Sequence, residues 1–329
     1  MSSKYVRSYE GNQNILLDMP HSGTLGLELV GNIPEIIKSR LRFTSKAVRQ
    51  TIGFGCDAAV PHMSDFLHLV AVCGLSGVSN DLARVYCDVN RSRDEVSGLA
   101  VQGYDSYENH HGTIWSRTLL KDADLSLSHH KLEGLVDENC ERMFKSPLST
   151  NEFRILMDEI YNPYHRALQE HHKKIVAKYG HCIHLALHSL PPVSVAKIRG
   201  GYICGKKAVR GPFDPIKNTL PDIILIHNNY QAAAKSVVDL VRLAFESAGL
   251  IVEDGRGPFL GDIGVTAIYG RPKEEGRRVK GVHVIGIEHV THDTEPERHL
   301  GNPKVDLIQA FKYRPIYREA IENLLTLKV

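Results

Sequence analysis

Two runs of mainly apolar residues, each followed directly by a histidine and a serine, constrain the fold of this chain more than any other feature. Residues 15–20 lead into His21, and residues 182–187 lead into His188. Such runs are typical of strands buried on both faces of a parallel sheet. The carboxyl ends of parallel strands share one edge, which is where open α/β sheets bind ligands. We therefore expect both histidines to lie at that edge.

The pairing of the two histidines matters more than either one alone. A single histidine after a strand is well explained by a structural role. Two histidines at the same edge favour a metal site, because neutral imidazole is the commonest protein ligand for zinc. At this point the sequence leaves both interpretations open.

Composition excludes several classes of partner. The chain has 329 residues, and its 40 Lys plus Arg nearly balance its 38 Asp plus Glu, for a formal charge of +2. This balance gives no reason to expect nucleic acid or an anionic membrane as the main partner. The six cysteines form no CxxC pair, and neither a signal peptide nor a membrane-spanning run is evident. We expect a cytoplasmic protein with reduced thiols.

The remaining segments alternate between strand and helix patterns, without repeats or a linker. This alternation predicts one α/β domain over residues 1–329. Strands are expected at residues 69–78, 84–89, 221–227, 250–254 and 279–287, and a glycine- and proline-rich loop at 255–276. Helices are expected within 33–52 and 58–69, over 149–178 with a kink before Pro163, over 230–248, and from Lys304 with Ile308, Phe311, Ile316 and Leu324 inward.

Four further polar residues stand where such elements end. Asp57 follows a helix break and is either an N-cap or a functional carboxylate. Arg91 follows the expected strand 84–89, and its guanidinium suits a carboxylate or an oxyanion, although a surface salt bridge is the simpler interpretation. Glu288 ends the last strand, where burial can tune a general base, and His165 lies beside the expected kink.

Taken in order, these short motifs resemble the N-formylglutamate amidohydrolase family. The likeness extends from about residue 15 to 292. Each motif is weak alone, and their order and spacing are the specific part. The motifs are PHSG (20–23), Asp57, DVNR (88–91), NPYH (162–165), HS (188–189), LPD (220–222), YGRP (269–272) and the late Ile-Glu (287–288).

The resemblance implies a fold and a set of site residues. The fold would be a mixed, mostly parallel sheet flanked by helices, like the zinc carboxypeptidase and phosphorylase/hydrolase folds. One divalent metal, zinc, would be held by His21, Asp57 and His188, with Glu28 as the alternative third ligand. Glu288 would be the general base and Arg91 the substrate arginine. Further substrate-binding residues would be Asn90, His165, Ser189, Arg256 and Arg271.

The implied activity is metal-dependent hydrolysis of a linear amide in a small molecule, an N-formyl or N-acyl amino acid, as in histidine degradation. A carboxypeptidase-like or aspartoacylase-like hydrolase and an inactive ligand-binding relative are the alternatives. Ala186, Gly286 and Ala267 depart from the family pattern, which has an aspartate at 186, a glutamine at 286 and an arginine near 267. Thr24 stands where related zinc hydrolases have a carboxylate. These departures leave the acyl amino acid open, with Arg256 or Arg271 able to compensate. The sequence does not indicate the oligomeric state.

Overall fold

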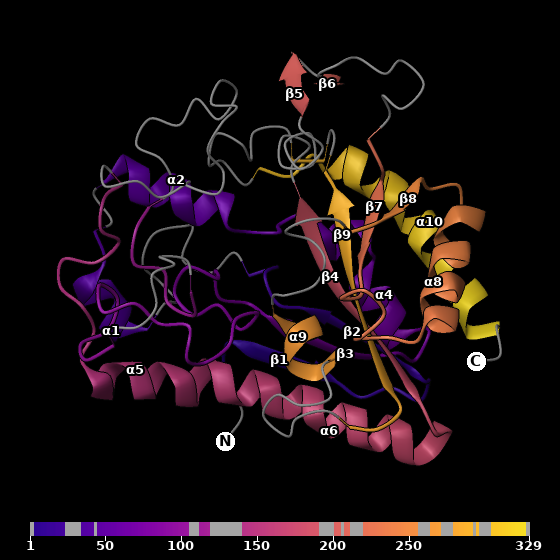
Figure 1. Cartoon of the computed structure of the whole chain (residues 1–329), viewed down its shortest axis with the longest axis horizontal. Helices are drawn as coiled ribbons and strands as arrows, with labels where there is room; N and C mark the ends of the chain where they lie inside the picture. The colour runs from indigo at the N-terminus through magenta and orange to yellow at the C-terminus, as the bar shows by residue number, and fades with distance from the viewer. Residues whose placement is uncertain are drawn as a thin grey trace.

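A central mixed sheet organises the chain (Figure 1). The structure, a computed structural model, describes residues 3–23, 34–42, 45–104, 112–118, 140–190, 201–204, 207–210, 220–255, 264–270, 279–291, 294–295 and 304–326. Within them the sheet has seven strands in the order β1-β3-β2-β4-β9-β7-β8. Its strands are β1 (Val6–Tyr9), β2 (Ile15–Met19), β3 (Ser76–Asn80), β4 (Cys182–Leu190), β7 (Ile223–Ile226), β8 (Val252–Asp254) and β9 (Val282–Val290).

The four strands β3, β2, β4 and β9 at the middle of the sheet are parallel to one another. Among the described residues of this sheet, the pairs β1–β3 and β7–β9 are antiparallel, while β8 pairs with β7 in parallel. A separate antiparallel pair joins β5 (Gly201–Cys204) and β6 (Lys207–Arg210). The predicted α/β class, with a mixed and mostly parallel sheet, is confirmed.

Helices cover both faces of the sheet (Figure 1). The long helix α6 packs on the first four strands, with α9 beside β9 on the same side, and α3, α4, α8 and α10 enclose the core on the other face. Strands β2 and β4 are buried along almost their whole length because helices lie on both sides. The helices are α1 (Glu35–Arg40), α2 (Lys46–Phe54), α3 (Val60–Met63), α4 (Phe66–Ala71), α5 (Thr150–Leu156), α6 (Asn162–Tyr179), α8 (Lys235–Ser247), α9 (Val265–Gly270) and α10 (Leu307–Thr326).

The helical region predicted at 149–178 is confirmed, including its irregularity before Pro163. Ser149 and Glu152 form a reciprocal capping box at its start. Gly180 ends it with a φ of 80°, a left-handed conformation that glycine adopts without strain. Before Pro163 the helix widens into a π-helical turn, Met157–Tyr161, which accommodates the proline.

Four other predictions about local structure are wrong, in whole or in part. Residues 84–89 form turns and irregular backbone instead of a strand. Residues 69–71 belong to α4, so β3 begins only at Ser76, and α9 lies inside the expected loop 255–276. In α10, Ile308 and Phe311 are exposed, whereas Ala310, Tyr317, Ala320, Ile321 and Leu324 face the core. Apolar residues in turns and at helix ends produced these errors, since local hydrophobicity does not identify the element.

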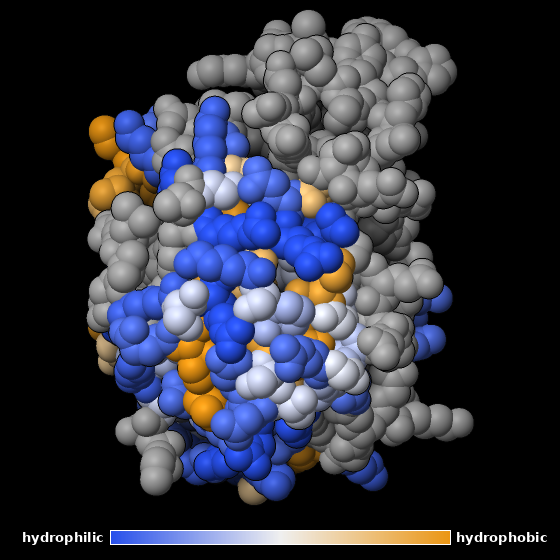
Figure 2. Space-filling view, turned by 90° about the vertical axis from the view of Figure 1, so that its left-hand side faces the viewer, coloured by the Kyte–Doolittle hydropathy of each residue, from blue (hydrophilic) through white to orange (hydrophobic). Residues whose placement is uncertain are grey.

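The helices in the described part of the chain were compared with the requirements of a membrane span. None of these helices combines the length and the apolar character needed to cross a bilayer. Seen from the side of α1 and α5, the surface formed by the described residues is mostly hydrophilic, with apolar residues scattered between the polar ones (Figure 2).

Candidate metal centre

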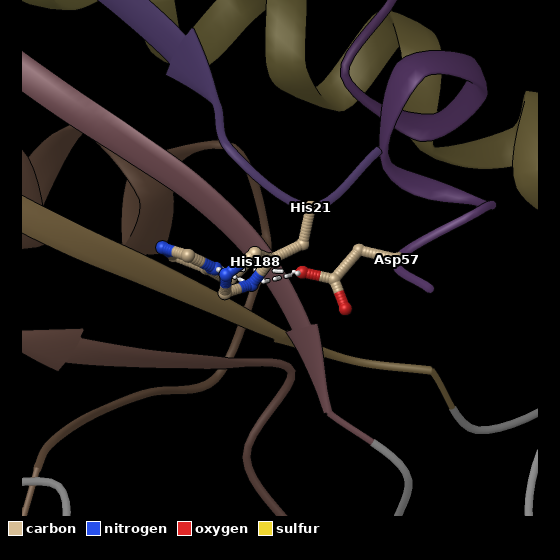
Figure 3. A group of neighbouring side chains, drawn as sticks. All are labelled: His21, Asp57 and His188. Carbon is tan, nitrogen blue, oxygen red and sulfur yellow. Dashed lines mark hydrogen bonds and ion pairs between the residues drawn. The ribbon is translucent and has the colours of Figure 1, made fainter. Parts of the chain in front are cut away.

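Three buried side chains converge at the carboxyl edge of β2 and β4 (Figure 3). His21 follows β2, His188 lies near the end of β4, and Asp57 precedes α3. The Nδ1 atoms of the two histidines are 3.2 Å apart, and Oδ2 of Asp57 lies 3.5 Å from Nδ1 of His21 and 3.4 Å from Nδ1 of His188. The prediction that both histidines lie at the carboxyl edge of the sheet is therefore confirmed.

The triangle of ligand atoms has the dimensions of one face of a tetrahedral zinc site. Zinc bonds of about 2.0–2.1 Å in tetrahedral geometry place neighbouring ligand atoms roughly 3.3–3.4 Å apart. The observed edges of 3.2, 3.4 and 3.5 Å match this spacing. Two imidazoles and one carboxylate also form a ligand set that zinc accepts, with a fourth position left for substrate or water. These residues fit a divalent metal ion.

Asp88 orients the first histidine. Its Oδ1 accepts a 2.8 Å hydrogen bond from Nε2 of His21, which leaves the Nδ1 lone pair of the neutral ring turned toward Asp57 and His188. Its Oδ2 accepts from Nε and Nη2 of Arg84, at 2.9 and 2.7 Å. Burial alone would raise the pKa of Asp88, but the positive charges of Arg84 and Arg91 and the hydrogen bond from His21 outweigh it and hold this pKa well below its usual range.

His188 is surrounded by acidic groups. Burial lowers the pKa of its imidazole, but the hydrogen bond to Asp57 and the negative charges of Glu288 and Asp18 outweigh burial, so the pKa is raised overall. Glu288 is the register partner of His188 on β9, so both side chains leave the same face of the sheet at neighbouring positions. The predicted general base therefore lies beside His188, one of the candidate metal ligands.

The DVNR turn brings Arg91 to the same region. Nε of Arg91 lies 3.8 Å from Oδ2 of Asp88, and its carbonyl accepts a 2.9 Å hydrogen bond from Oη of Tyr161. The side chain is only 14% exposed, so the interpretation of Arg91 as a surface salt bridge does not describe it. The backbone N–H of Asn90 donates to Oδ1 of Asp88 at 3.0 Å, and Gly264 lies directly against its side chain.

Other predicted residues are placed differently. Nδ1 of His165 lies 2.6 Å from Oη of Tyr269, inside the core. Ser189 is buried on the face opposite His188, and its hydroxyl donates to Glu295. Their roles toward substrate stay predictions. Glu28, Arg256 and Arg271 lie outside the described residues.

A buried polar network behind the edge was not anticipated. Asp18 is fully buried, and its carboxylate accepts from Oη of Tyr164 at 2.5 Å and lies 3.2 Å from Nε2 of His184. His184 in turn contacts His172 at 3.0 Å. Asp18 is also the register partner of Ala186. A carboxylate therefore lies beside the position where the family pattern has an aspartate, on the neighbouring strand.

Asp88 and Glu295 were also missed as parts of the site. Asp88 belongs to the DVNR motif, and Asp18 is a charged residue inside an apolar run, so each left a signal in the sequence. Glu295 has no such signal. The interpretation of Asp57 as an N-cap is not supported, because the N-cap residue of α3 is Ala59 and the carboxylate of Asp57 faces the histidines.

Comparison with known proteins decides the family. The sequence model of N-formylglutamate amidohydrolase matches residues 13–292, most of the chain. The chain belongs to the N-formylglutamate amidohydrolase family. Family membership supports an amidohydrolase activity and is consistent with a small-molecule substrate. A search of curated proteins found no match.

Two solved structures share the fold. One is N-formylglutamate amidohydrolase from Ralstonia eutropha JMP134, with 19% identity and a TM-score of 0.63 over 98% of this chain and 96% of that one. The other is gene product Atu2144 from Agrobacterium tumefaciens, with 15% identity and a TM-score of 0.51 over 97% and 95% of the two chains. At these identities the likeness extends to the fold alone.

Proposed function

We propose that this protein is a metal-dependent hydrolase that cleaves the linear amide of an N-formyl or N-acyl amino acid. One observation carries the proposal: Nδ1 of His21, Nδ1 of His188 and Oδ2 of Asp57 form a buried triangle with edges of 3.2–3.5 Å. Family membership adds the amide as the bond type. The ion would be held by these three side chains, and zinc suits them best.

When bound, a divalent ion of this kind supplies Lewis-acid chemistry, polarising a carbonyl and acidifying water to a pKa of about 7. The protein's own groups do the rest. Glu288, beside His188 in the sheet, takes the proton of the attacking water as the C–O bond forms. The C–N bond then breaks, and Glu288 returns the proton to the leaving nitrogen. The products are a carboxylic acid and a free amino acid.

Arg91 binds the substrate in this proposal. A guanidinium held near Asp88 by the DVNR turn offers planar donors to the substrate carboxylate or to the developing oxyanion. Because Tyr161 fixes the backbone carbonyl of Arg91, the side chain starts from a defined position. Burial of the edge residues keeps bulk water from competing for these donors.

The test is release of free amine from a panel of N-formyl and N-acetyl amino acids by the zinc-loaded protein, with Glu288→Gln as the matched variant. We expect turnover of at least one substrate and a loss of about 10²–10⁴-fold in kcat for the variant, since general-base catalysis contributes that much. The variant should keep its zinc. Zinc binding without turnover of any panel member would instead favour the inactive ligand-binding relative. Turnover of peptides or N-acetylaspartate alone would favour the carboxypeptidase-like or aspartoacylase-like alternative.

A further inference from the structure

Glu295 is a buried carboxylate between two segments that carry candidate metal ligands. Its side chain is 3% exposed, and it lies beyond residues 13–292, the part matched by the family model. Oε1 accepts a 2.8 Å hydrogen bond from the backbone N–H of Ala59, and Oε2 accepts a 3.4 Å hydrogen bond from Oγ of Ser189. Ala59 comes two residues after Asp57, and Ser189 directly follows His188.

The three candidate ligands are tied to one another in three different ways. His21 and His188 are held together by the pairing of β2 with β4. His21 and Asp57 are joined directly, because the N–H of Asp57 donates to the carbonyl of His21 at 2.9 Å. Asp57 and His188 belong to separate elements, and Glu295 connects the segments on which they stand. Glu295 thus connects the segment that carries Asp57 to the strand that carries His188.

The position of Glu295 is itself fixed by the chain around it. Thr294 donates from its N–H and its hydroxyl to the carbonyl of Thr291, at 2.6 and 2.9 Å, and Thr291 donates to the carbonyl of Leu190 at the end of β4. Asp306, which directly precedes α10, donates its N–H to the carbonyl of Thr294 at 2.9 Å. Helix α10 in turn packs on α3, where Nε of Arg314 donates to the carbonyl of His62 at 2.9 Å.

We propose that Glu295 is a positioning residue for the metal site, which sets the distance between the Asp57 carboxylate and the His188 imidazole through Ala59 and Ser189. The proposal rests on the proposed function, because it takes those side chains as ligands. In this proposal Ser189, whose side chain lies on the opposite face of the sheet from His188, helps to hold the metal site by its hydrogen bond to Glu295. The segment after residue 292 thereby contributes to a site whose ligands all lie within the family core.

The experiment is zinc affinity of the full-length, metal-free chain, measured by competition with a chromogenic chelator. Glu295→Ala removes both bonds, and we expect zinc to bind about 10- to 100-fold more weakly, as for other partners that orient metal ligands. Glu295→Gln retains an oxygen for the Ala59 N–H and an amide group beside Ser189, whose hydroxyl can accept from it, so its affinity should stay within about threefold of the parent.

Controls separate positioning from general loss of stability. Val241→Ala removes buried apolar volume in α8, away from the site, so its unfolding midpoint should fall while its zinc affinity stays unchanged. If Glu295→Ala does not fold, Ser189→Ala breaks one of the two bonds and should weaken zinc binding by a smaller factor. Parental affinity in folded Glu295→Ala, or in Ser189→Ala where that substitutes for it, overturns the proposal. A parent chain that binds no zinc would instead overturn the proposed function.

Discussion

Replacing Asp88 by asparagine tests how the site is held before any metal binds. Asp88 is fully buried and receives hydrogen bonds from His21, Arg84 and the N–H of Asn90. An asparagine side chain at this position would keep the shape but lose the negative charge. The guanidinium of Arg84, 16% exposed, would then be left without its ion-pair partner.

The magnitude follows from these contacts. Removing one member of a buried ion pair costs about 3–5 kcal/mol, and the partial exposure of Arg84 favours the lower end, about 3 kcal/mol. Asparagine can also present its amide N–H to Nε2 of His21, which would move the ring hydrogen to Nδ1 and block the ligand lone pair. We therefore expect zinc to bind about 10- to 100-fold more weakly.

Urea unfolding of the metal-free protein and chelator competition measure the two effects. Asp81→Asn is the matched control, because Asp81 pairs with Arg7 at the surface, and such pairs contribute less than about 1 kcal/mol. Asp81→Asn should leave zinc affinity unchanged. Parental stability together with parental zinc affinity in Asp88→Asn would refute the role assigned to this carboxylate.

Three further predictions follow from the same geometry. Arg91→Lys should raise KM for an N-acyl amino acid by about tenfold or more with zinc content unchanged, since lysine lacks the planar, bidentate donors of the guanidinium group. Steady-state kinetics that match those of the parent would contradict this prediction. Zinc affinity should fall as the pH drops through the raised pKa of His188, because its protonated ring cannot bind metal; affinity that does not vary between about pH 8 and 5 would be inconsistent with that ligand. Tyr164→Phe should lower the free energy of unfolding by about 1–3 kcal/mol, because it leaves the buried Asp18 short of a donor; an unchanged urea midpoint would argue against it.

The sequence predicted those parts of the site that follow from strand ends. His21 and His188 come directly after or near the end of buried parallel strands, so their meeting at one edge follows from the topology. Glu288 is likewise placed by its strand, in register with His188. Asp57 was predicted as a ligand only from the order of the motifs, because the local sequence around it is equally compatible with a ligand and with an N-cap.

The remaining parts depend on contacts between distant segments. Within residues 84–89, the apolar side chains Val85, Tyr86, Cys87 and Val89 are fully buried although the backbone forms turns and irregular structure. Hydrophobicity reports burial whatever the backbone conformation. Glu295 meets Ala59 across 236 positions of sequence, a pairing that no local pattern encodes. Asp18 was visible as a charge inside an apolar run, but its partners Tyr164 and His184 were not.

The most direct test of the account is the zinc content of the purified chain by elemental analysis, with His21→Ala and His188→Ala alongside. The account predicts about one zinc per chain, lost in both variants, while circular dichroism shows that both stay folded. A parent protein that takes up no zinc from a zinc-containing buffer, or variants that retain it in full, would contradict the metal centre on which the proposed hydrolysis depends.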